Sequence, residues 1–140
     1  MSVHLVEDMF NMHDHYGVHE VMETLDAEKL RMFLKFRIDF LQEELDEMIK
    51  AYNEGGENAA DDTVDALIDL VVVALGTLDA FQVDTYEAWD RVLAANMAKE
   101  VGVKASRPNP LGLPDLIKPE GWTAPTHADN IGLLSKVFDK

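Results

Sequence analysis

The sequence has no cysteine, which excludes disulfide bonds and thiolate metal sites and is typical of a reducing compartment. It also has no long apolar segment. The longest uncharged run, Leu70 to Leu78, is far shorter than the roughly 20 residues of a membrane-spanning helix. The first ten residues contain no basic region followed by an apolar stretch, so no secretory signal is visible. We therefore expect a soluble, cytoplasmic protein that does not bind membranes.

Basic residues are scarce: 12 lysines and arginines stand against 27 acidic residues, for a net charge of -15. Phosphate contacts supply most of the affinity of proteins for nucleic acid, so this balance argues against a nucleic-acid partner. A small anionic ligand is still compatible with the charge. It would need a bridging cation and a few well-placed basic side chains.

The sequence also lacks β-type alternation, internal repeats and low-complexity tracts, and the helical spacing of its apolar residues predicts an all-α fold. Three main helices are predicted, from Asp26 to the Glu54-Gly55-Gly56-Glu57 break, from Asn58 or Ala59 to Ala80, and from Asp84 to near Gly102. Weaker helices are expected over 3–16 and 128–138. All five prolines lie within 104–127, which predicts a loop.

The second main helix is apolar over more than one face after Asp69, and a helical hairpin alone cannot cover such a surface. We therefore expect a bundle of long antiparallel helices that is completed by oligomerisation, as a homodimer or a homotetramer. The length of 140 residues predicts one domain. Its parts are an N-terminal helix and turn (1–25), core helices (26–102), and a Pro-rich tail with a short C-terminal helix (103–140).

Two acidic clusters are the strongest functional signal. The first helix carries Glu43, Glu44 and Glu47, and the second carries Asp62, Asp65 and Asp69. A helix turns by about 100° per residue, so residues three or four apart share a face. A tight antiparallel hairpin would bring the two clusters face to face, and oxygen-only ligand sets suit magnesium or manganese. The spacing thus predicts a metal site that is shared by two helices.

A cation held in this way can neutralise phosphate oxygens and lower the pKa of a bound water, which favours hydrolysis of a phosphoanhydride. Glu43 and Asp69 could be additional ligands, orienting groups, or the base that takes the proton of the water. The competing interpretation is a solvated acidic helix face. It is weakened by Asp65 and Asp69, which lead into the apolar run where an unpaired carboxylate is costly. A di-iron site is disfavoured because no histidine follows an acid by three residues, and no EF-hand loop is present.

The run Glu43-Glu44-Leu45-Asp46-Glu47, followed by Asp62-Thr63-Val64-Asp65, resembles the EExxE and ExxD motifs of the MazG-like all-α nucleoside triphosphate pyrophosphohydrolases. This superfamily includes dimeric dUTPases and phosphoribosyl-ATP pyrophosphatase. Single-domain, phage-type members are also similar at Arg37, Gly76-Thr77, Asn96 to Lys99 and Lys118 to Pro125. The resemblance covers roughly Met9 to Pro125. Asp62 stands where the family usually has glutamate, a change that can shift metal preference towards manganese.

The resemblance implies hydrolysis of a nucleoside triphosphate between its α and β phosphates, with Mg²⁺ or Mn²⁺ as cofactor. The implied metal ligands are Glu44, Glu47, Asp62 and Asp65, with Glu43, Glu44 and Glu47 as the catalytic acids. Phosphate or sugar contacts are implied for Asn96, Lys99, Lys118 and Arg107, and base contacts for Asn11, His13 and Trp122. Analogy with phage-type relatives favours a purine deoxynucleotide such as dGTP, and a phage origin would mean the host cytoplasm.

Two other functions stay open at this point. One is a non-enzymatic acidic helical protein with an assembly or regulatory role, whose clusters only solvate it or bind cations. The other keeps the enzyme fold but takes a phosphoribosyl-linked nucleotide of histidine synthesis, as phosphoribosyl-ATP pyrophosphatase does.

Overall fold

The computed structural model describes residues 4–138. Its helices and strands are α1 (Leu5–His15), α2 (Val18–Thr24), α3 (Ala27–Glu54), α4 (Ala59–Ala80), α5 (Thr85–Met97), β1 (Glu100–Gly102), β2 (Asp115–Ile117) and α6 (Leu134–Phe138). The all-α prediction is confirmed, apart from this small two-stranded sheet. Contacts divide the described chain into a first unit, 4–85 with 130–138, and a second unit, 86–129. The single domain over 1–140 stays a prediction.

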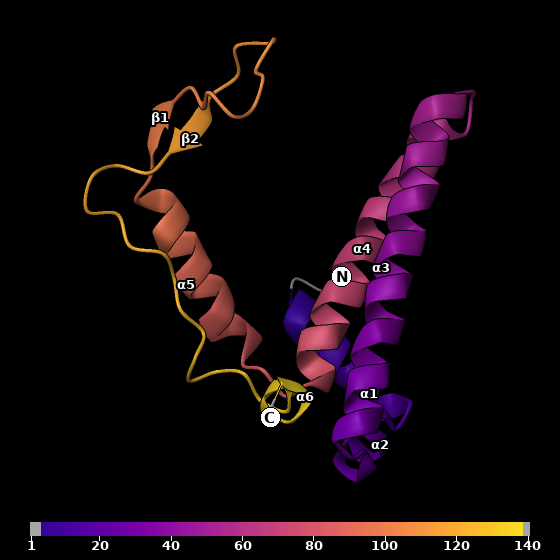
Figure 1. Cartoon of the computed structure of the whole chain (residues 1–140). Helices are drawn as coiled ribbons and strands as arrows, with labels where there is room; N and C mark the ends of the chain where they lie inside the picture. The colour runs from indigo at the N-terminus through magenta and orange to yellow at the C-terminus, as the bar shows by residue number, and fades with distance from the viewer. Residues whose placement is uncertain (1–3, 139–140) are drawn as a thin grey trace. The chain divides into compact units, whose positions relative to one another are not determined.

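Helices α3 and α4 lie side by side as an antiparallel hairpin (Figure 1). The side chain of Asp26 accepts a hydrogen bond from the Lys29 amide at 2.9 Å and begins α3 as an N-cap. Gly55 and Gly56 end α3 with φ values of 65° and 98°, a conformation that glycine adopts without the steric penalty of a side chain. The bounds of both helices agree with those predicted from the sequence.

The core of the first unit lies at the end of the hairpin that is far from the Gly55 turn. Its buried residues come from α2, α3, α6 and the end of α4, and they are Met22, Leu30, Ala80, Phe81 and Val137. Phe33 packs edge-to-face on Phe81, with ring centroids 5.6 Å apart. Each large apolar side chain that is fully buried stabilises the fold by about 1.5–3 kcal/mol, so this cluster anchors the hairpin.

The N-terminal part differs from the predicted helix and turn, because it forms two helices. Gly17 adopts φ 73° and separates α1 from α2. Helix α2 has only seven residues, too few for its apolar spacing to stand out from the sequence around it. Val3, where the predicted first helix began, lies outside the described residues.

The region after α5 also requires corrections. The third main helix ends at Met97 instead of continuing to near Gly102, because residues 100–102 pair with 115–117 as antiparallel strands. The side chain of Ile117 lies over Gly102, where a Cβ would come within 2.7 Å of its Cδ1 atom. One stretch of the predicted loop is therefore a strand. The predicted C-terminal helix over 128–138 is shorter and begins at Leu134.

The apolar surface of α4 is only partly covered within the chain. Ala66, Val73 and Gly76 are buried, but Leu67 is 47% exposed and Ile68 57% exposed. The expected burial of this segment is thus not supplied by the rest of the described chain, and oligomerisation stays a prediction. Among residues 4–138, no helix is both long enough and apolar enough to span a membrane.

We predict that Gly132→Ala destabilises the first unit strongly. Gly132 has φ 51°, and a Cβ there would lie 2.0 Å from the carbonyl oxygen of Phe81, which accepts a hydrogen bond from the Leu133 amide. Gly17→Ala is the matched control, because Gly17 has φ 73° and no atom nearer than 3.9 Å to the added Cβ. The control should lose only about 1–2 kcal/mol of unfolding free energy, which is the cost of a side chain in the left-handed backbone conformation. Equal losses in urea unfolding would contradict the packing role of Gly132.

Candidate functional site

Acidic side chains of α3 and α4 meet near the turn of the hairpin. Glu47 of α3 and Asp62 and Asp65 of α4 line one cavity of about 310 Å³, together with Lys50, Ala51, Glu54 and Gly55. The antiparallel arrangement predicted from the sequence therefore brings three of the four predicted metal ligands to the same cavity. Their ligand roles stay predictions.

Glu44 is the most unusual acid of the site. It is only 7% exposed, and its Oε2 atom is buried without a hydrogen-bond partner among the described residues. Burial, followed by the negative charges of Glu47 and Asp69, raises the pKa of Glu44 to about 7. The closeness of these two carboxylates also favours the protonated form, because an ionised carboxylate only accepts hydrogen bonds and Glu44 can donate one to them only while protonated. No cationic side chain of residues 4–138 is among the causes of this shift, although Lys50 lines the neighbouring cavity, and the carboxylate oxygens are donors that suit a hard divalent metal ion.

Glu43 has a different environment. It is exposed and lines a second hollow of about 380 Å³ on α3, whose other residues are Asp39, Gln42, Asp46, Glu47 and Lys50. Asp62 and Asp65 do not line this hollow. Glu47 lines both hollows, so Glu43 shares a hollow with Glu47 but not with Asp62 and Asp65. Glu43 thus differs from Glu44, which is turned towards Asp69.

Arg37 precedes the acidic cluster on α3. Its Nε atom is buried and has no hydrogen-bond partner within the described chain, and its guanidinium carbon lies 5.1 Å from the ring centroid of Phe33. Burial lowers the pKa of Arg37 from its ordinary value. The guanidinium is thus held by an aromatic face and keeps hydrogen-bonding capacity.

In the second unit, Lys99, Lys118 and Trp122 come together. The ammonium nitrogen of Lys99 lies 5.3 Å from the centroid of the Trp122 ring, and that of Lys118 lies 5.1 Å from it. The indole N–H of Trp122 donates to the carbonyl oxygen of Ala95 at 2.7 Å, which holds the ring against α5. Asn96, near the end of α5, is exposed, and its carbonyl oxygen accepts a hydrogen bond from the Lys99 amide. Three residues predicted to contact a nucleotide therefore form one cationic aromatic cluster.

Arg107 does not join this cluster through any contact seen in the described chain. It forms an ion pair with Asp115 inside the β1–β2 segment. The backbone N–H of Leu116, and next the Arg107 guanidinium, hold the pKa of Asp115 below its usual range. Arg107 therefore has an acidic partner within the second unit already.

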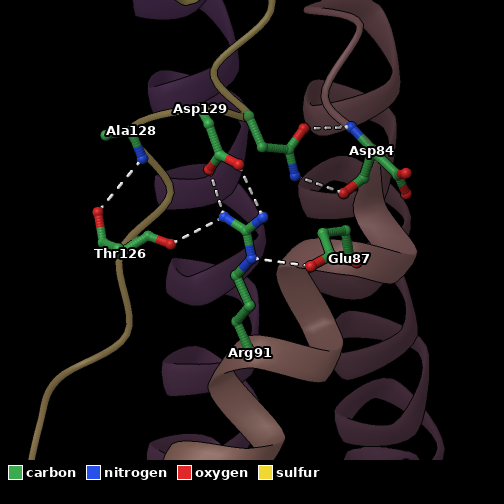
Figure 2. Close-up of polar contacts among 7 residues, drawn as sticks. Asp84, Glu87, Arg91, Thr126, Ala128 and Asp129 are labelled. Carbon is green, nitrogen blue, oxygen red and sulfur yellow. Dashed lines mark hydrogen bonds and ion pairs between the residues drawn. The ribbon is translucent and has the colours of Figure 1, made fainter.

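Arg91 holds the tail of the second unit against α5. Figure 2 shows its guanidinium between Glu87, Asp129 and the carbonyl oxygen of Thr126. Two of its nitrogens donate to Asp129, at 2.6 and 3.1 Å, and this bidentate pairing holds the pKa of Asp129 below its usual range. The tail and α5 enclose a groove of about 1000 Å³, of which Trp122 is one wall.

The two N-terminal residues predicted to contact a base, Asn11 and His13, differ in their exposure. Asn11 is exposed on α1. His13 is buried, and its Nδ1 lies 2.7 Å from Oδ2 of Asp79, so its ring is not open to a nucleotide in this structure. Sequence reasoning missed Asp79 and its second partner, His19. The available signal was Asp79 itself, an acid inside the apolar end of α4 that needs a polar partner if it is buried.

A comparison with protein-family models decides the family. The phosphoribosyl-ATP pyrophosphohydrolase model matches residues 18–96, which is more than half of the chain. The chain belongs to this family. It is therefore a member of the MazG-like all-α superfamily, as the acidic motifs indicated. No curated protein and no solved structure matches the chain significantly.

Membership of the phosphoribosyl-ATP pyrophosphohydrolase family supports hydrolysis of a pyrophosphate bond in a nucleotide. The matched range covers both acidic clusters and ends at Asn96, before the strands. Lys99, Lys118 and Trp122 thus lie beyond the family match. The family supports the carboxylate site, whereas the cationic cluster rests on the structure of the second unit.

We predict that Glu44 makes the metal-free protein less stable as the pH rises. Its pKa is raised from 4.5 to about 7 in the folded state, so its stabilising contribution is complete below pH 4.5 and is lost as the pH rises through 7. The measurement is urea unfolding as a function of pH in the presence of a chelator. The unfolding free energy of Glu44→Gln should not fall in this way, while that of the exposed control Glu28→Gln should follow the wild type. Parallel curves for wild type and Glu44→Gln would contradict the assignment.

Proposed function

We propose that this chain is a metal-dependent nucleoside triphosphate pyrophosphohydrolase. It cleaves the bond between the α and β phosphates and releases the monophosphate and pyrophosphate. The observation that carries the proposal is the buried Glu44, which lies beside Glu47 and Asp69, has no cationic partner within residues 4–138, and falls inside the range matched by the family. A buried carboxyl group among more exposed acids suits a cation and a phosphate substrate better than it suits stability.

The proposed ligands of Mg²⁺ or Mn²⁺ are Glu44, Glu47, Asp62 and Asp65. When bound, the metal supplies charge neutralisation for phosphate oxygens and lowers the pKa of a coordinated water. Glu44 gives up its proton when a cation is present, because the cation offsets the repulsion from its neighbours. Asp69 contacts Glu44 and orients it. Glu43, exposed beside Glu47, is the candidate to accept a proton from water.

Lys99, Lys118 and Trp122 are the proposed contacts to the phosphates, sugar and base of the substrate, with Asn96 as a further polar contact. Two ammonium groups at one indole create a local positive charge on a strongly acidic protein, which favours an anion. The indole N–H of Trp122 is already used by Ala95, so Trp122 can offer a base its ring but no donor. Arg107 would have to leave Asp115 before it could contact a phosphate.

The proposed substrate is a canonical or modified deoxynucleoside triphosphate, with a purine such as dGTP favoured by analogy to phage-type relatives. A second candidate substrate is phosphoribosyl-ATP, which is favoured by the description of the matching family. We further propose a homodimer or homotetramer, because Leu67 and Ile68 of α4 stay exposed in the single chain.

We predict monophosphate and pyrophosphate as products when the protein is incubated with ribo- and deoxynucleoside triphosphates, or with phosphoribosyl-ATP, in Mg²⁺ or Mn²⁺. A chelator should abolish the reaction. Glu44→Gln should lower kcat by more than the roughly 10–100-fold that the loss of an orienting group costs, because a proposed ligand is removed. Glu28→Gln, on the exposed first turn of α3, should keep full activity.

The products of these incubations distinguish the candidate substrates and functions. Turnover of phosphoribosyl-ATP alone would select the second substrate. Absence of turnover with every nucleotide, in protein whose helical content is normal, would favour the non-enzymatic acidic protein. Full activity in Glu44→Gln would show that the carboxylate site is assigned to the wrong residues.

We predict that Lys99→Met and Lys118→Met each raise KM for the triphosphate by roughly 10- to 150-fold, with a smaller change in kcat, because each removes a charged contact worth about 1.5–3 kcal/mol. Lys136→Met, on α6, is the charge-matched control and should leave KM unchanged. Steady-state kinetics with the preferred substrate makes the comparison. Unchanged KM in both variants would contradict a phosphate-binding role for the cluster.

A further inference from the structure

A second group of potential metal ligands lies outside the acidic motifs. His13 of α1, His19 of α2 and Asp79 of α4 place one ligand atom each within 4.8 Å of the others, and among the described residues they are the one group of at least three acids or histidines that does so. Nδ1 of His13 and Nε2 of His19 both lie 2.7 Å from the same atom, Oδ2 of Asp79. Three helices thus aim their donor atoms at one point.

The surroundings hold both rings in place. Gly76 of α4 makes room for His13, because a Cβ at this position would lie 3.3 Å from Cε1 and Nε2 of the ring. His19 packs on Phe10, with ring centroids 4.6 Å apart. The outer nitrogen of His19, Nδ1, lies 4.0 Å from a carboxylate oxygen of Asp14. This separation is longer than a hydrogen bond, so the Asp14 carboxylate adds a negative charge beside the ring and no fixed contact.

The donor chemistry of this cluster differs from that of the carboxylate site. Two imidazole nitrogens and one carboxylate oxygen suit zinc and neighbouring transition metals, whereas magnesium prefers oxygen ligands alone. Zinc bonds of about 2.0–2.2 Å place tetrahedral ligand atoms roughly 3.3 Å apart, somewhat wider than the spacing of 2.7 Å to Asp79. The rings need to retreat by only about half an ångström, and His19 is partly exposed on the seven-residue helix α2.

We propose that His13, His19 and Asp79 form a second divalent-metal site, selective for zinc-class ions, that fastens the N-terminal helices α1 and α2 to α4. Three protein ligands leave a fourth position for water. The bound ion replaces the two imidazole hydrogen bonds to Asp79 with coordination bonds. Because it binds the folded state, it raises the stability of the first unit. The site is independent of the proposed nucleotide chemistry.

The test uses the full chain stripped of metal by a chelator and then dialysed. Calorimetric titration with Zn²⁺ in excess Mg²⁺ should give one Zn²⁺ per chain and a higher midpoint of thermal unfolding. Titration with Co²⁺ should give the visible absorption bands of a tetrahedral site. His19→Gln, which keeps an amide donor for Asp79, should weaken Zn²⁺ binding by more than about 100-fold. His15→Gln, at an exposed position on α1, is the matched control and should bind as the wild type does.

Circular dichroism of His19→Gln establishes that the variant is folded, and Asp79→Asn provides an independent second variant. Glu44→Gln should keep its Zn²⁺ affinity, which separates this site from the carboxylate cavity. The proposal is overturned if the wild type binds no Zn²⁺ in excess Mg²⁺, or if His19→Gln and Asp79→Asn bind Zn²⁺ as tightly as the wild type. Octahedral Co²⁺ spectra would overturn the tetrahedral site.

Discussion

Repulsion among carboxylates is the constraint that governs the hairpin of α3 and α4. Glu44 is buried between Glu47 and Asp69, and no cationic side chain in the described residues bonds its Oε2 atom. In the free protein the raised pKa of Glu44 reduces this repulsion, because the group keeps its proton until the pH rises to about 7. The apolar core around Phe81, at the other end of the hairpin, supplies stability that the acidic end does not. The molecule thus separates the part that holds it together from the part that we propose to bind a cation.

The chain sorts its candidate metal-binding side chains by chemical type. Oxygen donors line the cavity near Gly55, while the imidazoles of His13 and His19 gather around Asp79. Ions of different hardness would therefore find different partners on the same helix, α4, which contributes acids to both groups. In the second unit, the ammonium groups of Lys99 and Lys118 both lie over the ring of Trp122, which its hydrogen bond to Ala95 holds in place. Their cation–π contacts use an aromatic ring in place of an acidic partner.

The sequence was sufficient for α3 and α4 because their signals are local. Asp26 caps α3, the glycine pair ends it, and the spacing of Glu44, Glu47, Asp62 and Asp65 follows the helical repeat. Features that depend on distant partners were not predictable. The pairing of residues 100–102 with 115–117 requires contacts across the proline-containing loop, and the meeting of His19 with Asp79 joins positions 60 residues apart. Burial of Glu44 between two acids likewise depends on how the helices pack.

The length of the glycine turn between α3 and α4 sets how the acidic residues of the two helices face each other. Surface turns ordinarily tolerate changes in length. Here each added or removed residue that continued the helix would rotate α4 by about 100° and shift it by about 1.5 Å relative to α3. Asp62 and Asp65 would leave the cavity that they share with Glu47. Natural variation in this protein should therefore keep the length of the turn at Gly55 and Gly56, where the positive φ values also favour glycine.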